Sequence, residues 1–173
     1  LCKRIVQRCG GNPFFIEEVV RSLIDEDALE LRNGRYQATE KISRMIIPQT
    51  VGDLLMSRID RLEEQTRDVV KTASVIGRSF FLRIIETVLD SMDDIDGRLD
   101  YLTRIQLLSV RKRIGEIEYL FRHALAREAV YGSILKQQRR SLHLKIAKSI
   151  HKIFGNKLNE FYGMMAYHYS QGG

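Results

Sequence analysis

Apolar residues recur at helical spacing along most of this chain, and this periodicity is what most constrains its fold. The pairs Phe15/Ile16, Val19/Val20 and Leu23/Ile24 lie four residues apart, which predicts an amphipathic helix over about 13–27. Similar stripes predict four helices between Thr50 and Ile105, carried by Val51–Leu62, Val69–Ile76, Phe80–Leu89 and Ile95–Ile105. Three further helices are predicted over about 124–135, 139–154 and 157–170.

Two short segments depart from the helical period. The stretch LELRNGRYQAT alternates around Asn33-Gly34, a dipeptide typical of tight β-hairpins. A second alternation, Leu108 and Val110 followed by Ile117, Tyr119 and Phe121, lies on the two sides of Gly115 and predicts another hairpin. The predicted fold class is therefore mainly α with small β-hairpins. Helices followed by a two-stranded hairpin are also the order of a winged helix.

Composition narrows the class of protein. Hydrophobic residues make up 44% and charged residues 29% of the 173 residues, which is typical of a globular chain. No apolar run approaches the roughly 18 residues of a membrane span, so we expect no membrane partner. Two cysteines, Cys2 and Cys9, are too few for a disulfide framework or a zinc site, which favours a cytoplasmic location. The chain starts at Leu1, and we expect it to be a piece of a longer protein.

The net charge of +6 is unevenly distributed. Between residues 122 and 152 a single acid, Glu128, accompanies eight cations: Arg122, Arg127, Lys136, Arg139, Arg140, Lys145, Lys148 and Lys152. Such a run is most often a solvated helix face. It also makes Arg139 and Arg140 candidate contacts for phosphate or an acidic protein partner.

Common enzyme signatures are missing from the sequence. It contains no G-x-x-x-x-G-K-[ST], G-x-S-x-G, H-E-x-x-H or C-x-x-C motif. Asp93, Asp94 and Asp96 cluster where a helix is predicted to begin, a position that favours acids. His143 and His151 are interpreted as surface groups. We therefore predict no catalytic residues, no metal ligands and no self-contained enzyme.

The stretch GGNPFFIEE has a local explanation. Asn12 is a good N-cap, Pro13 suits the first position of a helix, and Gly10-Gly11 would end the helix before it. This interpretation does not exclude a second role for the same residues.

Five segments in this order resemble one family. They are GNPFFIEEVVRSLIDEDAL, IPQTVGDLLMSRIDRL, VVKTASVIGRSFF, YLFRHALAREAVYGSIL with RRSLHLKIAKSI, and AYHYSQGG. They are similar to the signal-transduction ATPases with numerous domains (STAND), a branch of the AAA-type ATPases, and above all to bacterial members that combine an adenylate cyclase with tetratricopeptide repeats. The resemblance implies three parts. Residues 1–47 would end the helical lid of a nucleotide-binding domain, residues 48–122 would form a winged helix, and residues 123–173 would lead into helical repeats.

The resemblance also implies nucleotide contacts in the longer protein. The family carries a G-x-P motif whose proline packs on adenine, and Gly11-Asn12-Pro13 matches it. The family places a histidine on the β-phosphate of ADP just after the last strand, and His123 occupies that place. Many members have Met-His-Asp there, whereas this chain has Arg-His-Ala. A structural role for His123 at a strand–helix junction stays open.

Three functions follow as hypotheses. The first is a regulatory switch in which ADP or ATP, bound with Mg²⁺ by a preceding domain, controls the repeats or an output domain such as a cyclase. The second is a DNA-binding winged helix whose Arg111, Lys112 and Arg113 meet phosphates, although the fourth predicted helix lacks the side chains that read base edges. The third is a helical scaffold for a protein partner. The fragment by itself is expected to need no cofactor.

Overall fold

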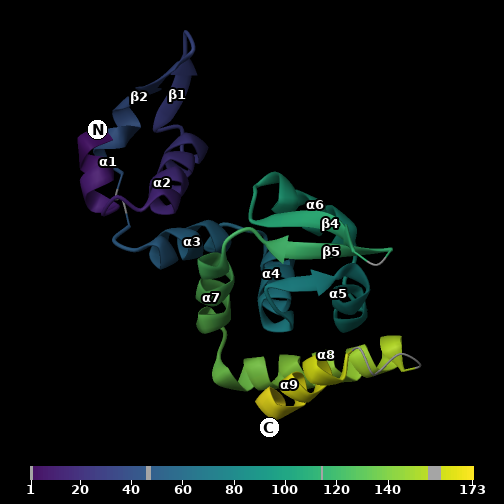
Figure 1. Cartoon of the computed structure of the whole chain (residues 1–173). Helices are drawn as coiled ribbons and strands as arrows, with labels where there is room; N and C mark the ends of the chain where they lie inside the picture. The colour runs from purple at the N-terminus through teal and green to yellow at the C-terminus, as the bar shows by residue number, and fades with distance from the viewer. Residues whose placement is uncertain (1, 46–47, 114, 156–160) are drawn as a thin grey trace. The chain divides into compact units, whose positions relative to one another are not determined.

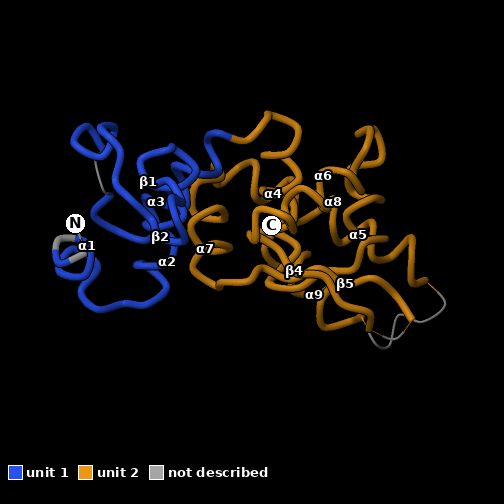
Figure 2. Tube along the Cα trace, turned by 90° about the horizontal axis from the view of Figure 1, so that it is seen from above, with its two compact units in different colours: residues 1–61 blue, residues 62–173 orange. Residues whose placement is uncertain are grey.

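The computed structural model describes residues 2–45, 48–113, 115–155 and 161–173 (Figure 1). The chain is mainly helical with two small antiparallel sheets, as the sequence predicts. It divides into two compact units, Leu1–Arg61 (unit 1) and Leu62–Gly173 (unit 2), which are coloured separately in Figure 2. The helix after Thr50 belongs to unit 1, whereas the sequence analysis assigned it to the second predicted part.

Unit 1 is built of three α-helices, a hairpin and a 3₁₀ helix among its described residues. These are α1 (Cys2–Arg8), α2 (Pro13–Asp25), β1 (Leu29–Arg32), β2 (Arg35–Ala38), η1 (Glu40–Ser43) and α3 (Val51–Asp60). Asn33 and Gly34 have φ values of 52° and 74°, the left-handed backbone that a tight hairpin turn requires. The first predicted hairpin is therefore confirmed, with Arg32 opposite Arg35 in the register.

The core of unit 1 forms because α2 buries one stripe. Phe15, Val19 and Leu23 share one core cluster with Leu54 of α3 and Ile5 of α1, and all five are at most 5% exposed. The side chain of Thr50 accepts a hydrogen bond from the Asp53 amide at 3.0 Å, which fixes the start of α3.

Unit 2 contains six α-helices and one three-stranded sheet in its described residues. The elements are α4 (Glu64–Ile76), β3 (Ser79–Phe81), α5 (Leu82–Val88), α6 (Ile95–Arg104), β4 (Leu108–Arg113), β5 (Glu116–Phe121), α7 (Ala124–Ser133), α8 (Lys136–Phe154) and α9 (Tyr162–Gly172). The sheet order is β3-β5-β4, with both pairs antiparallel. The Asp94 side chain caps α6 by accepting a hydrogen bond from the Gly97 amide at 3.2 Å, and the acid cluster lies at a helix start as predicted.

The predicted helix over Phe80–Leu89 is wrong at its start. Ser79–Phe81 form strand β3, in which Phe80 lies opposite Tyr119 and Phe81 opposite Glu118, and the helix α5 begins only at Leu82. The second hairpin is confirmed, but it belongs to a three-stranded sheet. Phe80 and Tyr119 stack with ring centroids 5.8 Å apart, so β3 is held by core packing as well as by backbone hydrogen bonds.

The last three helices pack on this sheet-containing core. α8 packs against α4, α5 and α9, and α7 packs against α4 (Figure 1). Ile146 and Ile150 on α8 are fully buried and form the apolar face of the helix predicted over 139–154. The predicted helix over 157–170 lies partly outside the described residues, and its described part is α9.

Candidate functional site

The Gly-Asn-Pro turn starts α2 as the local interpretation predicts. Gly10 and Gly11 have φ values of 57° and 75°, in the left-handed region that glycine adopts readily. The Asn12 side chain accepts a hydrogen bond from the Phe15 amide at 3.3 Å, and Pro13 is the first residue of α2. Gly11, Asn12 and Pro13 are all exposed, so the proline ring can meet a flat apolar group.

Unit 1 also holds a cleft of about 280 Å³ beside α2 and α3. Leu23 and Leu54 form part of its wall, together with the ion-paired Glu26 and Arg61. Neither Gly11 nor Pro13 lines this cleft. The predicted adenine contact is therefore an exposed surface rather than part of this cleft.

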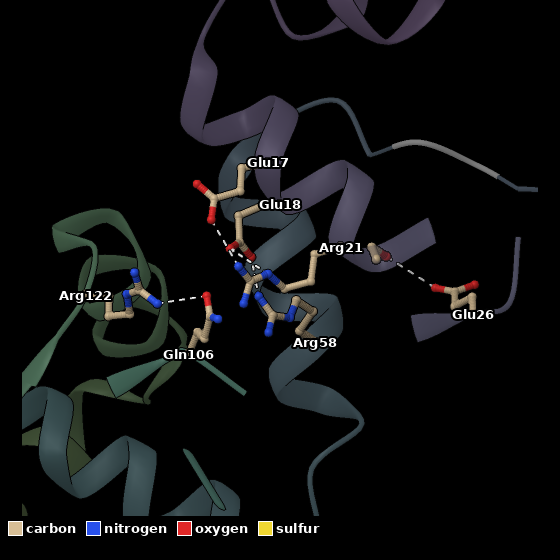
Figure 3. A network of polar contacts seen from close by, with 8 residues as sticks. Glu17, Glu18, Arg21, Glu26, Arg58, Gln106 and Arg122 are labelled. Atoms are coloured by element: carbon tan, nitrogen blue, oxygen red, sulfur yellow. Dashed lines mark hydrogen bonds and ion pairs between the residues drawn. The ribbon is translucent and has the colours of Figure 1, made fainter. Parts of the chain in front are cut away.

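A charge cluster on α2 and α3 was missed by sequence reasoning. Glu18 is 3% exposed and forms an ion pair with Arg58, which is 12% exposed (Figure 3). Arg21 lies 3.8 Å from Glu18 and 3.0 Å from Glu17. The spacing of Glu17, Glu18 and Arg21 on one helix could have indicated half of this cluster. Arg58 is 40 residues from Glu18, so only the packing of α2 on α3 reveals the pair.

His123 lies between β5 and α7, at the junction that the resemblance assigns to it. It occupies the N-cap position of α7 with an extended backbone, and its side chain makes no capping hydrogen bond. The ring is half-buried. The neighbouring Arg122 donates a hydrogen bond to Gln106 at 2.8 Å (Figure 3). Pro13 belongs to unit 1 and His123 to unit 2, so the surroundings of each residue are described within its own unit.

The cationic side chains of β4 are less available for contacts with phosphate than the sequence suggests. Arg111 and Arg113 donate hydrogen bonds to the two carboxylate oxygens of Glu118 on β5, at 2.6 and 3.2 Å. Glu118 is almost fully buried, whereas both arginines are about half exposed. Lys112 lies opposite Ile117 and points to the other face of the strand. Of the three candidate phosphate contacts, two thus compensate a buried carboxylate.

The environment of Glu118 lowers the pKa of its carboxyl group. Burial raises the pKa of this carboxyl, but hydrogen bonds from Arg111, Ser79 and Arg113 outweigh burial and bring the pKa below its usual 4.5. The folded state therefore binds the proton less well than the unfolded state does. The resulting stabilisation is present above pH 4.5 and is lost as the pH falls through the lower folded value.

Replacing both Arg111 and Arg113 by alanine should reverse this pH dependence. Burial would then be opposed by Ser79 alone, so the pKa of Glu118 should rise above 4.5 and the free energy of unfolding should fall as the pH rises through that range. At pH 7 we expect a loss of about 2 kcal/mol, the size of one or two hydrogen bonds to a charged group. Urea unfolding from pH 3 to pH 7 measures both effects. Lys112→Ala on the same strand is the control and should leave the pH profile unchanged.

The two candidate arginines on the basic helix α8 differ in how accessible their guanidinium groups are. Arg140 is exposed, while the guanidinium of Arg139 lies over the Tyr131 ring, 4.8 Å from its centroid. Arg127 lies over the same ring at 5.0 Å and donates a hydrogen bond to the Ser74 carbonyl. Arg140 is therefore the more accessible of the two predicted contacts.

One prediction about the histidines is wrong. His151 is exposed as expected, but His143 is only 1% exposed. Its Nδ1 lies 2.8 Å from Nδ1 of His168 on α9, and its Nε2 lies 3.1 Å from the Tyr131 hydroxyl on α7. His143 is buried because it lies on the same helix stripe as Ile146 and Ile150.

The described parts of the chain hold neither a cluster of metal-ligating side chains nor a helix suited to crossing a membrane. No group of three or more His, Cys, Asp or Glu side chains there is placed to hold a metal ion. Within residues 2–45, 48–113, 115–155 and 161–173, none of the helices has the length and apolar character needed to cross a membrane.

Comparison with known proteins adds little about function. No family model matches the chain. The sequence is 26% identical over 148 residues to an uncharacterized protein of Rhizobium meliloti (strain 1021). This match covers 83% of the chain but only 14% of that protein, so the similarity concerns a small part of a much longer polypeptide.

Proposed function

We propose that the chain is the regulatory part of a larger cytoplasmic signalling ATPase of the STAND type. A preceding domain would bind ADP or ATP with Mg²⁺, and unit 2 would couple the bound nucleotide to helical repeats or an output domain that follows. The chain itself would carry no catalytic residues. A rearrangement of this kind is driven by contacts that differ between the two nucleotide states.

The observation that carries this proposal is the element order of residues 64–121. Helix α4, strand β3, helices α5 and α6 and hairpin β4–β5 follow one another, with the sheet order β3-β5-β4. This is the order expected of a winged helix. We accordingly begin the proposed winged helix at α4, since α3 packs in unit 1. The helices α7, α8 and α9 would then form the connection to the repeats.

The exposed Gly-Asn-Pro turn and His123 support the nucleotide part of the proposal. Pro13 offers a rigid apolar ring next to two glycines with positive φ. His123 follows the last strand, where an imidazole N–H could donate a charge-assisted hydrogen bond to a phosphate. The match to a much longer relative agrees with a module inside a large protein.

Nucleotide titration of the longer protein, with its preceding domain present, tests the proposal. One charge-assisted hydrogen bond is worth roughly 1.5–3 kcal/mol, so His123→Ala should weaken ADP binding by about 10- to 100-fold. ATP binding should weaken less, because only a contact that differs between states biases a switch. Pro13→Ala should weaken both nucleotides alike, since adenine is common to them.

His151→Ala is the matched control, because it removes an exposed histidine of the same unit. It should leave both affinities unchanged. Equal losses of ADP and ATP affinity in His123→Ala, or no loss, would make His123 a structural residue. The proposal would then rest on the fold alone.

The DNA-binding alternative is less well supported by unit 2. In a winged helix, α6 would be the element that enters the groove, and its exposed residues include the acids Asp96 and Asp100. Arg111 and Arg113 on β4 are paired with Glu118. We therefore expect only weak binding to duplex DNA, without sequence preference and with a steep dependence on salt. Nanomolar, sequence-selective binding at physiological salt would favour this alternative instead.

A further inference from the structure

Three helices of unit 2 meet at a small buried polar network. The Tyr131 hydroxyl of α7 contacts His143 Nε2 of α8 at 3.1 Å, and His143 Nδ1 contacts His168 Nδ1 of α9 at 2.8 Å. The two histidines are 1% and 0% exposed. In the described chain, Nε2 of His168 has no hydrogen bond of ordinary geometry, although a contact with the Ile76 backbone at the end of α4 favours its protonated form. Polar groups are thus central to the packing of α9 on α8.

The contact between the two rings limits how many protons the two Nδ1 atoms can carry. Two nitrogens 2.8 Å apart require one hydrogen between them, so one Nδ1 donates and the other accepts. If His143 donates, its Nε2 accepts a hydrogen bond from the Tyr131 hydroxyl, and the opposite tautomers reverse both bonds. In both arrangements the two rings are neutral, and a proton added to one ring would keep the Nδ1–H···Nδ1 contact but would place a charge in the buried network. When both Nδ1 atoms carry a proton, two N–H groups face each other and the rings must separate.

The surroundings of the network oppose a positive charge. The guanidinium groups of Arg127 on α7 and Arg139 on α8 lie over the Tyr131 ring, 5.0 and 4.8 Å from its centroid. From α9 the Tyr167 ring faces His143, with centroids 5.8 Å apart, and α4 contributes the neutral Ile76 backbone.

The side of α8 toward α5 adds no counter-charge. There Lys145 and Asp90 form an exposed ion pair at 3.8 Å that is neutral as a whole. The charged side chains that act on the two rings are therefore cations, Arg127 and Arg139. A proton added to either ring has no carboxylate to compensate it.

We propose that His143 and His168 form a proton-controlled latch, which holds α9 on α8 while both rings are neutral and releases α9 when they are protonated. The release would also separate Gly172 of α9 from α8, where a Cβ atom would lie 2.6 Å from the Leu144 side chain. The latch does not depend on nucleotide binding.

The direction of the pH effect follows from burial. Burial and then the positive charges of Arg127 and Arg139 lower the pKa of His143, and burial together with His143 lowers that of His168 to about 4. A released ring regains its usual 6.5, so the released form binds more protons between these values. Between pH 7.5 and pH 5 the population with α9 released should therefore rise about 30-fold through His168 alone.

Amide hydrogen exchange of α9 in the 173-residue chain tests the latch. After correction for the intrinsic effect of pH, the opening equilibrium of α9 should increase about 30-fold from pH 7.5 to pH 5. His168→Gln keeps a donor and an acceptor but cannot take up a proton, so it should reduce this increase to a few-fold. His151→Gln, at the exposed histidine of α8, is the matched control and should keep the full increase.

Imidazole NMR titration of the unsubstituted chain supplies a readout that needs no variant. The His168 ring should stay neutral at pH 6 while α9 is held on α8, because its pKa in the folded chain is lowered to about 4. The proposal is overturned if His168→Gln and His151→Gln show the same pH dependence of α9 exchange. It is equally overturned if the His168 ring becomes cationic near pH 6 while α9 stays protected.

Discussion

Replacing Arg58 by methionine is expected to lower the free energy of unfolding of unit 1 by about 3 kcal/mol. The substitution leaves the Glu18 carboxylate buried between α2 and α3 without its main partner (Figure 3). Arg21 remains 3.8 Å away, but it is also paired with Glu17 and compensates only in part. The expected loss therefore lies at the lower end of the roughly 3–5 kcal/mol found for broken buried pairs.

Hydrogen exchange of the α2 and α3 amides in denaturant measures this loss within unit 1. The control is Arg32→Met, which breaks the exposed ion pair with Glu30 and should cost less than about 1 kcal/mol. Glu18→Leu combined with Arg58→Met removes both charges and should recover most of the stability. A loss in Arg58→Met no larger than in Arg32→Met would show that water reaches Glu18.

The sequence predicted the elements whose cause is local. The Asn33-Gly34 hairpin and the Asn12 cap each depend on residues within a few positions of one another. The apolar stripe of α8 likewise gives its buried face directly. Local turn and cap chemistry acts through the same backbone atoms in any fold, so it can be recognised before the tertiary structure is known.

Features that depend on distant residues escaped prediction. Strand β3 was read as helix because Phe80, Phe81 and Ile84 keep the four-residue spacing of α5, and only pairing with β5 makes the first two residues extended. The Glu18–Arg58 pair joins positions 40 residues apart. His143 could have been placed inside from the stripe of Ile146 and Ile150, but its partner His168 lies 25 residues further on.

A substitution in strand β3 is expected to have the second large effect. Phe80→Ala should lower the free energy of unfolding of unit 2 by about 3–5 kcal/mol. Phe80 is 1% exposed and stacks on Tyr119 of β5, so truncation removes buried apolar surface and leaves a cavity against the central strand. Phe80→Leu keeps most of the side-chain volume and should lose less. Val110→Ala is the matched control, because Val110 also lies opposite Tyr119 but is 52% exposed, and it should cost less than about 0.5 kcal/mol.

Which elements of unit 2 lose stability in Phe80→Ala tests the winged-helix proposal as well as the role of β3. If α4, α5, α6 and the sheet unfold as one cooperative unit, Phe80→Ala should reduce hydrogen-exchange protection by the same free energy in all of them. The amides of α6 and β4 are the informative ones, because neither element pairs with β3 in the sheet order β3-β5-β4. A loss of protection confined to β3 and the start of α5 would mean that the short strand is not part of the cooperative unit. The proposed winged helix, which would couple the nucleotide state to the following helices, would then not include β3.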